Sequence, residues 1–285
     1  MKKKIILCAD GVCDIGEELQ KKFNVNYFNF HIQIGDESYV DGLEVTPEDL
    51  YAAWRERGIL PKTAAITPTE YEEFFKLWVD AGYEIIHINI GTALSAAHQN
   101  CCATAKKLGN VYPVDSANLS SGIGLLVIKA GEMIDQGLDA QEIQRQLIEM
   151  REKSHASFIL DTLEFMAAGG RCSSVAAFGA NLLKLKPCIE VDSTDKGKMG
   201  VGKKYRGSME KVLVEYIEDK LSNHNDLDLD RVFITHSGSP QSDIDLAKSE
   251  IKKYADFKET YVTKASGTIS AHCGPRTLGV LFMTK

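Results

Sequence analysis

Four side chains far apart in the sequence have the chemistry that binds an acidic group. Thr63 and Ser95 carry hydroxyls, Arg171 carries a guanidinium, and His272 carries an imidazole in AHCGP, which we expect to be a loop. All of these groups can donate hydrogen bonds to a carboxylate. Each also has a structural interpretation, since an arginine often forms a surface ion pair and a histidine beside a turn is often structural. The residue types alone leave both interpretations open.

Ser95 lies in a stretch in which the hydrophobic period changes. Residues 84–90 are apolar and β-branched, which predicts a buried strand, and small residues after Ser95 recur at helical spacing. In a parallel α/β sheet such a junction lies where ligands bind, and the hydroxyls of Thr92 and Ser95 would lie beside free N–H groups of the helix start. An anion would suit this position. The structural alternative is that Ser95 caps its helix and Thr92 fills a turn.

The elements that position these residues alternate between strand and helix patterns. Strands are predicted at residues 4–9, 27–34, 38–41, 84–90, 111–114, 157–160, 187–191, 199–205, 231–235 and 259–263, and a final strand follows the Gly274-Pro275 turn. Helices are predicted at residues 15–23, after Thr46, Thr67 and Ser95, and at residues 118–136, 140–153, 162–168, 173–185, 209–221 and 242–254. We therefore predict an α/β protein of two domains, residues 1–157 and 158–285, with largely parallel sheets.

Capping residues mark several helix starts. Thr46 and Thr67 are each followed by proline and, at the third helical position, by an acid. This pattern predicts an N-cap with a capping box. Asp139 and Asp14 are followed by glutamate at the same spacing, so we expect them to cap their helices as well. Two glycines before Arg171 are expected to end a short helix and to fix the position of that arginine.

Composition excludes several classes of protein. The chain has 285 residues, 44% of them hydrophobic, and a formal net charge of −7. Because phosphate binding needs a concentrated basic surface, this charge argues against a nucleic-acid partner. The seven cysteines are scattered without zinc spacing, so we expect reduced thiols and no metal site. No stretch approaches the roughly 20 apolar residues of a membrane span, and a cytoplasmic protein with at most transient membrane contact is expected.

Different short motifs follow one another along the whole chain in a specific order. They are Asp10 in the first turn, Asp41-Gly42, Thr63, Leu94-Ser95, Asp115-Ser116 with Gly122 and Gly124, Gly169-Gly170-Arg171, Lys186-Pro187, Lys204 to Arg206, Ala271-His272 and Gly274-Pro275. The order and spacing of these motifs resemble those of the DegV family, the fatty-acid-binding proteins that include the FakB subunits of bacterial fatty acid kinase.

The resemblance implies that a long-chain fatty acid is buried between the two domains. Its carboxylate would be held by Thr63, Ser95 and His272, with Arg171 in the same polar network. In the fatty acid kinase system a separate ATP-dependent kinase phosphorylates the carboxylate, and the acyl group then moves towards phospholipid synthesis. Arg206 matches the position implicated in docking that kinase. The chain would thus be a lipid-binding protein without a cofactor, which agrees with its lack of a P-loop or dinucleotide fingerprint.

The sequence departs from the family pattern close to the expected carboxylate. Where the family usually has Gly-Thr-Tyr after the serine, this chain has Ala96-Ala97-His98, and Arg276 stands where a second glycine usually follows Gly-Pro. These changes bear on the choice of acyl chain. Two other functions stay open. One is an acyl hydrolase with Ser95 as nucleophile and His272 as base, although no G-x-S-x-G elbow surrounds Ser95. The other is a lipid-free regulatory protein with the same fold.

Overall fold

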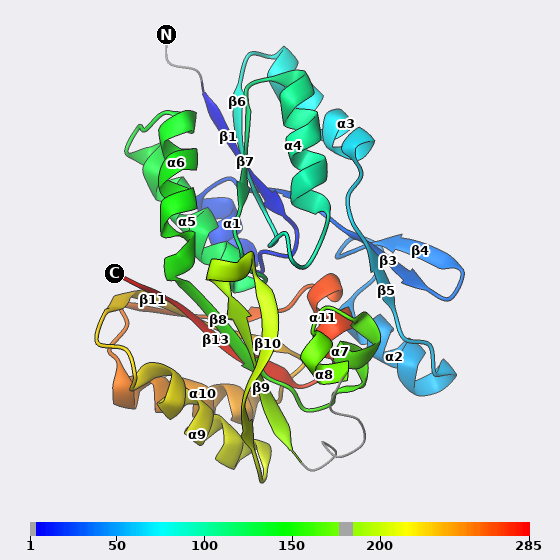
Figure 1. The fold of residues 1–285 in the computed structure, drawn as a ribbon, viewed down its shortest axis with the longest axis vertical. Coiled ribbons are helices and arrows are strands. Elements are labelled where there is room, and N and C mark those ends of the chain that lie inside the picture. Colours follow the sequence, from blue (N-terminus) through cyan, green and yellow to red (C-terminus); the bar gives the residue numbers. More distant parts are fainter. Residues whose placement is uncertain (1–3, 177–184) are drawn as a thin grey trace.

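The computed structural model describes residues 4–176 and 185–285, and its first half is built on a parallel sheet. The strands lie in the order β2 (Asn26–Phe28), β1 (Ile5–Asp10), β6 (Glu84–Asn89) and β7 (Val111–Asp115), and every neighbouring pair is parallel. α3 (Pro68–Asp80) and α4 (Ala97–Leu108) cover one face, and α5 (Ser121–Asp135) and α6 (Ala140–Met150) cover the other (Figure 1). α1 (Gly16–Lys22) follows β1. The predicted α/β fold is confirmed.

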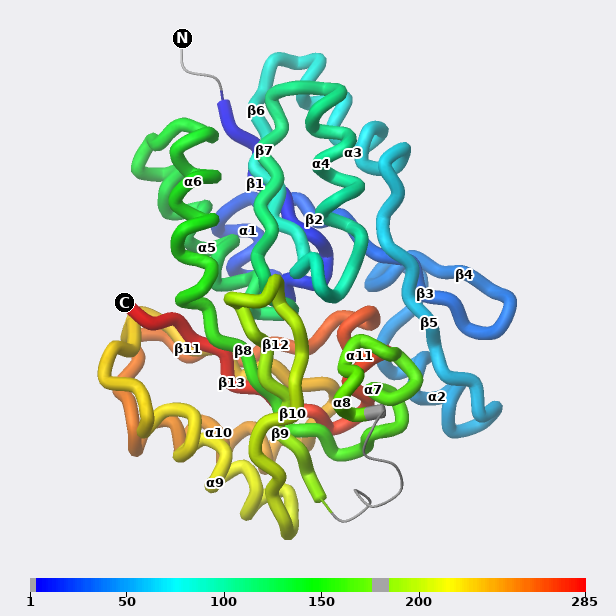
Figure 2. The backbone as a smooth tube through the Cα atoms, viewed as in Figure 1, coloured from blue at the N-terminus to red at the C-terminus, as the bar shows by residue number. Residues whose placement is uncertain are grey.

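The second sheet has six described strands and is mostly antiparallel. Their order is β10 (Lys198–Tyr205), β9 (Lys186–Asp192), β8 (Ser154–Ile159), β13 (Thr277–Thr284), β11 (Leu227–Ser237) and β12 (Glu259–Lys264). Among these described strands only β11 and β12 pair in parallel. The prediction of largely parallel sheets therefore holds for the first sheet and is wrong for the second. The C-terminal strand β13 inserts antiparallel between β8 and β11 (Figure 2), and β9 pairs antiparallel with both β8 and β10.

Helices close the second sheet on both faces. α9 (Met209–Leu221) and α10 (Gln241–Tyr254) pack on one face (Figure 1), and their core includes Tyr216, Ile234 and Phe282. α5 contacts β8 and β13 on the other face, so the core of the first half continues into the second. The proposed division between residues 157 and 158 falls within β8.

A small third sheet and four helices complete the region next to the second sheet. The sheet has the order β4 (Glu37–Val40), β3 (His31–Ile34) and β5 (Lys62–Ala64), all antiparallel. The helices are α2 (Pro47–Arg57), α7 (Glu164–Gly169), α8 (Ser173–Ala176) and α11 (Gly267–Cys273). The predicted hairpin with its turn after Ile34 is confirmed, but residues 27–34 are not one strand. β2 pairs with β1 and β3 pairs with β4, so the chain changes sheet between them.

Most of the helix starts predicted from capping residues are confirmed. Thr46 and Thr67 form capping boxes with Asp49 and Glu70, and the Asp139 side chain accepts a hydrogen bond from the Glu142 N–H. The predicted Asp14 cap is wrong, because the Asp14 carboxylate accepts hydrogen bonds from Ser120 and Ser266 instead. Short 3-10 turns lie at Arg151–Lys153 (η1) and Ser193–Asp195 (η3). Of the helix predicted at residues 173–185, α8 is the described part, and residues 177–184 lie outside the described residues.

Asp14 is used for tertiary contacts instead of a helix cap. Its backbone has a left-handed φ of 43°, and α1 begins after Ile15 without a side-chain cap. The buried carboxylate accepts hydrogen bonds from the Ser120 hydroxyl (2.5 Å) and the Ser266 N–H (3.0 Å). It therefore ties the first βα unit to the starts of α5 and α11.

Candidate functional site

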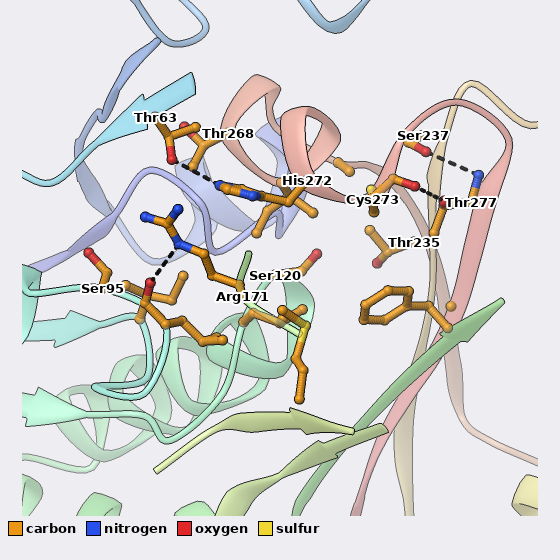
Figure 3. A pocket seen from close by; sticks show the side chains of 18 of the residues that line it. Thr63, Ser95, Ser120, Arg171, Thr235, Ser237, Thr268, His272, Cys273 and Thr277 are labelled. Atoms are coloured by element: carbon orange, nitrogen blue, oxygen red, sulfur yellow. Dashed lines mark hydrogen bonds between the residues drawn. The ribbon is translucent and has the colours of Figure 1, made fainter. Parts of the chain in front are cut away.

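The four candidate residues line one cavity of about 230 Å³ at the junction of the three sheets (Figure 3). A single buried water needs only about 10–15 Å³ of such volume, so this cavity is a ligand-sized space and not a packing defect. Its walls are largely apolar, and they include Phe30, Ile90, Leu94, Leu119, Phe158, Met166, Met199, Ile269 and Leu281. Apart from Leu94, which precedes Ser95 in its motif, the sequence did not mark these residues as cavity walls, because a hydrophobic pattern does not distinguish a cavity wall from a filled core.

Thr63 and His272 meet at one end of the cavity. Thr63 Oγ1, on β5, lies 2.9 Å from Nε2 of His272 (Figure 3). His272 lies in the last turn of α11, so the expectation of a loop histidine is wrong. The two residues are 209 positions apart, and only the packing of α11 against β5 brings them together.

No acceptor within residues 4–176 and 185–285 takes the hydroxyl proton of Ser95. Ser95 Oγ accepts a hydrogen bond from the N–H of Ala97, the first residue of α4, at 3.2 Å. Thr92 behaves differently, because its hydroxyl donates to the Asp115 carboxylate at 2.8 Å and it does not line the cavity. Of the two hydroxyls at this junction, Ser95 alone is therefore part of the site.

Arg171 reaches the same end of the cavity from the turn after α7. Nη1 donates to the carbonyl of Gly169 (2.8 Å), and Nε lies 3.5 Å from the carbonyl of Leu94 (Figure 3). Gly170 caps α7 with a left-handed φ of 67°, so the predicted glycine-terminated helix is confirmed. Gly169 has a different role, since a Cβ at this position would overlap Nδ1 of His272 and lie 3.1 Å from its Cε1.

Asp41 holds the helix that carries His272. Its buried carboxylate accepts hydrogen bonds from the N–H groups of Gly267 (2.9 Å) and Thr268 (2.7 Å), the first two residues of α11. A carboxylate at a helix N-terminus also interacts favourably with the free N–H groups there. The seven-residue α11 therefore depends on a contact from a distant hairpin. In the sequence, Asp41 stood out only as part of the Asp41-Gly42 motif, and its contact with α11 was not predicted.

Burial and a neighbouring cation keep His272 neutral. Burial, and then the positive charge of Arg171, lower the pKa of His272 to about 4. At neutral pH the site thus combines a cationic guanidinium, two hydroxyls and a neutral imidazole. Nδ1 of His272 has no hydrogen-bond partner among the described residues.

The hydroxyls at the other end of the cavity are already used. Ser120 donates to Asp14, and Thr235 lies 2.9 Å from the Thr263 hydroxyl. Ser237 and Thr277 donate to backbone carbonyls at 2.5 and 2.9 Å. These side chains therefore offer mainly carbon atoms to a ligand, and the cavity has one hydrogen-bonding end and one apolar end.

The remaining candidate residues lie outside this end of the cavity. Arg206 follows β10 on the exposed surface and does not line the cavity. Arg276 forms an ion pair with Asp243 (3.0 Å between Nε and Oδ2) and also does not line it. No group of three or more potential metal ligands occurs in residues 4–176 and 185–285.

The geometry does not form the Ser–His pair of a hydrolase. Nε2 of His272 bonds to Thr63, and no hydrogen bond joins Ser95 to His272 in the part of the chain that the structure describes. A serine nucleophile needs a base within hydrogen-bond reach. None of the described helices is both long and apolar enough to cross a bilayer.

Comparison with known proteins extends the similarity over the full chain. The model of the DegV family matches residues 4–285. A DegV domain-containing protein of Clostridium perfringens is 29% identical over 75% of this chain and 77% of its own. One from Clostridium acetobutylicum is 28% identical over 99% of both chains.

Solved structures share the fold. A fatty-acid-binding DegV family protein from Thermus thermophilus has a TM-score of 0.88 at 24% identity. The match covers 99% of this chain and 100% of the Thermus chain. DegV from Bacillus subtilis, a fatty acid binding protein, has a TM-score of 0.84 at 23% identity, with 100% of both chains covered. A fatty acid binding DegV family protein from Streptococcus agalactiae has a TM-score of 0.88 at 23% identity over 99% of both chains.

Proposed function

The chain belongs to the DegV family, and from this premise we propose that it binds a long-chain fatty acid in its cavity and presents the carboxylate to a separate fatty acid kinase. The observation that supports this most is the convergence of Thr63, Ser95, Arg171 and His272 at one end of an otherwise apolar cavity. Relatives of the same fold are fatty-acid-binding proteins, which agrees with such a ligand.

In this proposal the carboxylate receives hydrogen bonds from Thr63 and Ser95. A carboxylate offers only acceptors, so the Thr63 hydroxyl donates to it and accepts in turn from the Nε2–H of neutral His272. Ser95 donates its free hydroxyl proton, and Arg171 supplies a positive charge for the buried anion. Charge-assisted hydrogen bonds of this kind offset the cost of removing a carboxylate from water.

The apolar end of the cavity accounts for the tail. Burying the methylenes of palmitate at about 0.8 kcal/mol each gives a gross gain on the order of 10 kcal/mol. Association costs reduce this gain but leave enough for tight binding. A cavity with donors at one end only also sets the direction of the ligand, with its carboxylate beside Thr63 and its methyl end beside Thr235 and Phe158.

The kinase is a separate partner in this proposal. Its ATP supplies the phosphoryl group, a carboxylate oxygen attacks the γ-phosphorus, and ADP leaves, so that an acyl phosphate forms. Arg206, exposed at the end of β10, belongs to the proposed docking surface and not to the lipid site.

Solvent extraction of the purified protein followed by mass spectrometry tests the ligand. We expect a monocarboxylic fatty acid at close to one per chain, and rebinding of labelled palmitate or oleate after the lipid is removed. A Ser95→Ala and Thr63→Val double variant, prepared in parallel, should retain much less lipid. A lipid-free wild-type preparation that also fails to bind labelled palmitate and oleate would contradict the proposal.

A further inference from the structure

A second constellation lies outside the cavity, on α4. Sγ of Cys102 lies 3.3 Å from Nε2 of His98, and Nδ1 of His98 lies 3.1 Å from Oδ1 of Asn89. Cys102 is exposed, whereas the other six cysteines of the chain are buried. Because His98 and Cys102 are four residues apart on one helix, their side chains share a face.

The hydrogen bonds of Asn89 determine which nitrogen of His98 carries the proton. The Asn89 amide nitrogen donates to the Asp10 carboxylate (3.2 Å) and to Tyr71 Oη (3.0 Å), whose own hydroxyl donates to Asp10. A carboxylate only accepts, so the amide oxygen of Asn89 must face His98. Nδ1 of His98 is then the donor, and the lone pair of Nε2 faces the thiol of Cys102.

We propose that Cys102, His98 and Asn89 form a base-assisted thiol site that exchanges with low-molecular-weight disulfides. His98 removes the thiol proton as the Cys102 sulfur attacks one sulfur of the disulfide. The S–S bond breaks, the second sulfur leaves as a thiolate, and the imidazolium returns the proton to it. One mixed disulfide and one free thiol result, so no outside oxidant is needed. Asn89 is a positioning residue, because it sets the tautomer of His98.

The electrostatic surroundings favour a neutral resting pair. Burial, and then Asp115, raise the pKa of the Cys102 thiol, while burial lowers the pKa of His98. The charged and titratable groups around His98 are Asp115 on β7, Asp10 on β1, His87 on β6 and Arg151 on η1. At neutral pH the thiol and the imidazole are thus both uncharged, and the base acts only as the sulfur attacks.

Disulfide exchange fits the position of Cys102 better than acyl transfer. An acyl acceptor needs N–H donors aimed at the developing oxyanion. Cys102 lies inside α4 (Ala97–Leu108), where backbone N–H groups are used within the helix. Attack on a disulfide needs only an accessible thiol and a base. This inference does not depend on the proposed lipid function.

The test is the rate of reaction of the full-length protein with 4,4′-dithiodipyridine, a neutral disulfide that releases a thiopyridone measured by its ultraviolet absorbance. We expect one fast equivalent per chain, absent from Cys102→Ser because the other thiols are buried. At pH 7, His98→Gln should react at least about tenfold more slowly, given that general bases typically contribute more than this. Gln99→Ala, an exposed change in the same turn, should react like the wild type.

The pH dependence of the wild-type rate constant distinguishes a histidine that acts as a base from one with a purely structural role. Base assistance predicts a rate constant that is nearly level from about pH 6.5 to pH 8.5, because neutral imidazole and thiol both persist there. An unassisted thiol reacts through its thiolate, so its rate constant rises roughly tenfold per pH unit over this range. A tenfold rise per unit in the wild type, or the same rate in His98→Gln as in Gln99→Ala, would overturn the proposal.

Discussion

The close approach of Gly169 to His272 gives a sharp test of the site. A Cβ at position 169 would overlap Nδ1 of His272, and carbon and nitrogen atoms normally stay about 3.5 Å apart or more. In Gly169→Ala the ring must therefore retreat by about 1 Å. The 2.9 Å contact between Thr63 and His272 then exceeds hydrogen-bond length. This hydrogen bond joins two neutral groups, and losing such a bond costs roughly 0.5–1.5 kcal/mol, so we expect about 2- to 10-fold weaker fatty acid binding.

The fold should survive this change. Gly169 is the last residue of α7, and alanine is intrinsically favoured over glycine in a helix by about 1 kcal/mol. Gly170→Ala is the matched control, because that glycine has a left-handed φ of 67° and no atom lies within 4 Å of its missing Cβ. It should lose stability, by roughly 1 kcal/mol, but keep its affinity for the ligand.

A double-mutant cycle separates the mechanism from a general loss of structure. Equilibrium binding of labelled palmitate would be measured for Gly169→Ala in the wild-type and His272→Ala backgrounds. Without the ring the new methyl group has room, so Gly169→Ala should change affinity less than about twofold in the second background. Wild-type affinity in Gly169→Ala alone, or equal losses in both backgrounds, would show that the position of the His272 ring does not determine fatty acid binding.

Three further predictions concern the headgroup, the partner and pH. Ser95→Ala should weaken palmitate binding about tenfold or more, and Thr92→Ala should weaken it less, because Thr92 bonds to Asp115; equal affinities in a titration would count against the placement of the carboxylate. Arg206→Ala should keep lipid affinity but reduce acyl-phosphate formation when a fatty acid kinase and ATP are added, whereas the chain alone should not hydrolyse ATP; a parallel loss of lipid binding would place Arg206 in the lipid site. The pKa of His272 is lowered to about 4, below its ordinary value near 6.5, so from pH 6.5 downwards the unfolded chain binds a proton that the folded chain does not. Between pH 6.5 and pH 5 the free energy of unfolding should therefore fall by about 1.6 kcal/mol more in the wild type than in His272→Gln, since the slope approaches about 1.4 kcal/mol per unit only below pH 6. Urea unfolding that shows the same pH dependence for both would contradict this.

Local signals predicted local structure well. A capping residue acts on N–H groups two or three positions away, so the patterns at Thr46, Thr67 and Asp139 were enough to place three helix starts. The pattern at Asp14 looked the same but was wrong, because Ser120 and Ser266 lie near this carboxylate only in the folded protein.

Features set by distant contacts could not be predicted from the residues alone. α11 is a short segment with two glycines nearby, and its start is satisfied by Asp41, more than 200 positions earlier. The direction of β13 depends on which strands it joins, and periodicity does not contain that information. The unit formed by Asn89, His98 and Cys102 was missed for a related reason, since its members come from a strand end and a helix face that only the fold aligns.

The order of motifs was informative where single residues were not. Thr63, Ser95, Arg171 and His272 each had a structural alternative, and the family resemblance singled them out together. The structure brings all four to one cavity end, while their contacts with a ligand stay a prediction.

A crystal structure of the complex with a saturated fatty acid would show where the carboxylate binds and in which direction the tail lies. We expect a carboxylate within hydrogen-bond distance of Thr63 Oγ1 and Ser95 Oγ, near the Arg171 guanidinium, with the methyl end towards Thr235 and Phe158. A ligand in the reverse direction, with its carboxylate beside Ser120 and Thr235, or a fatty acid bound outside this cavity, would contradict it.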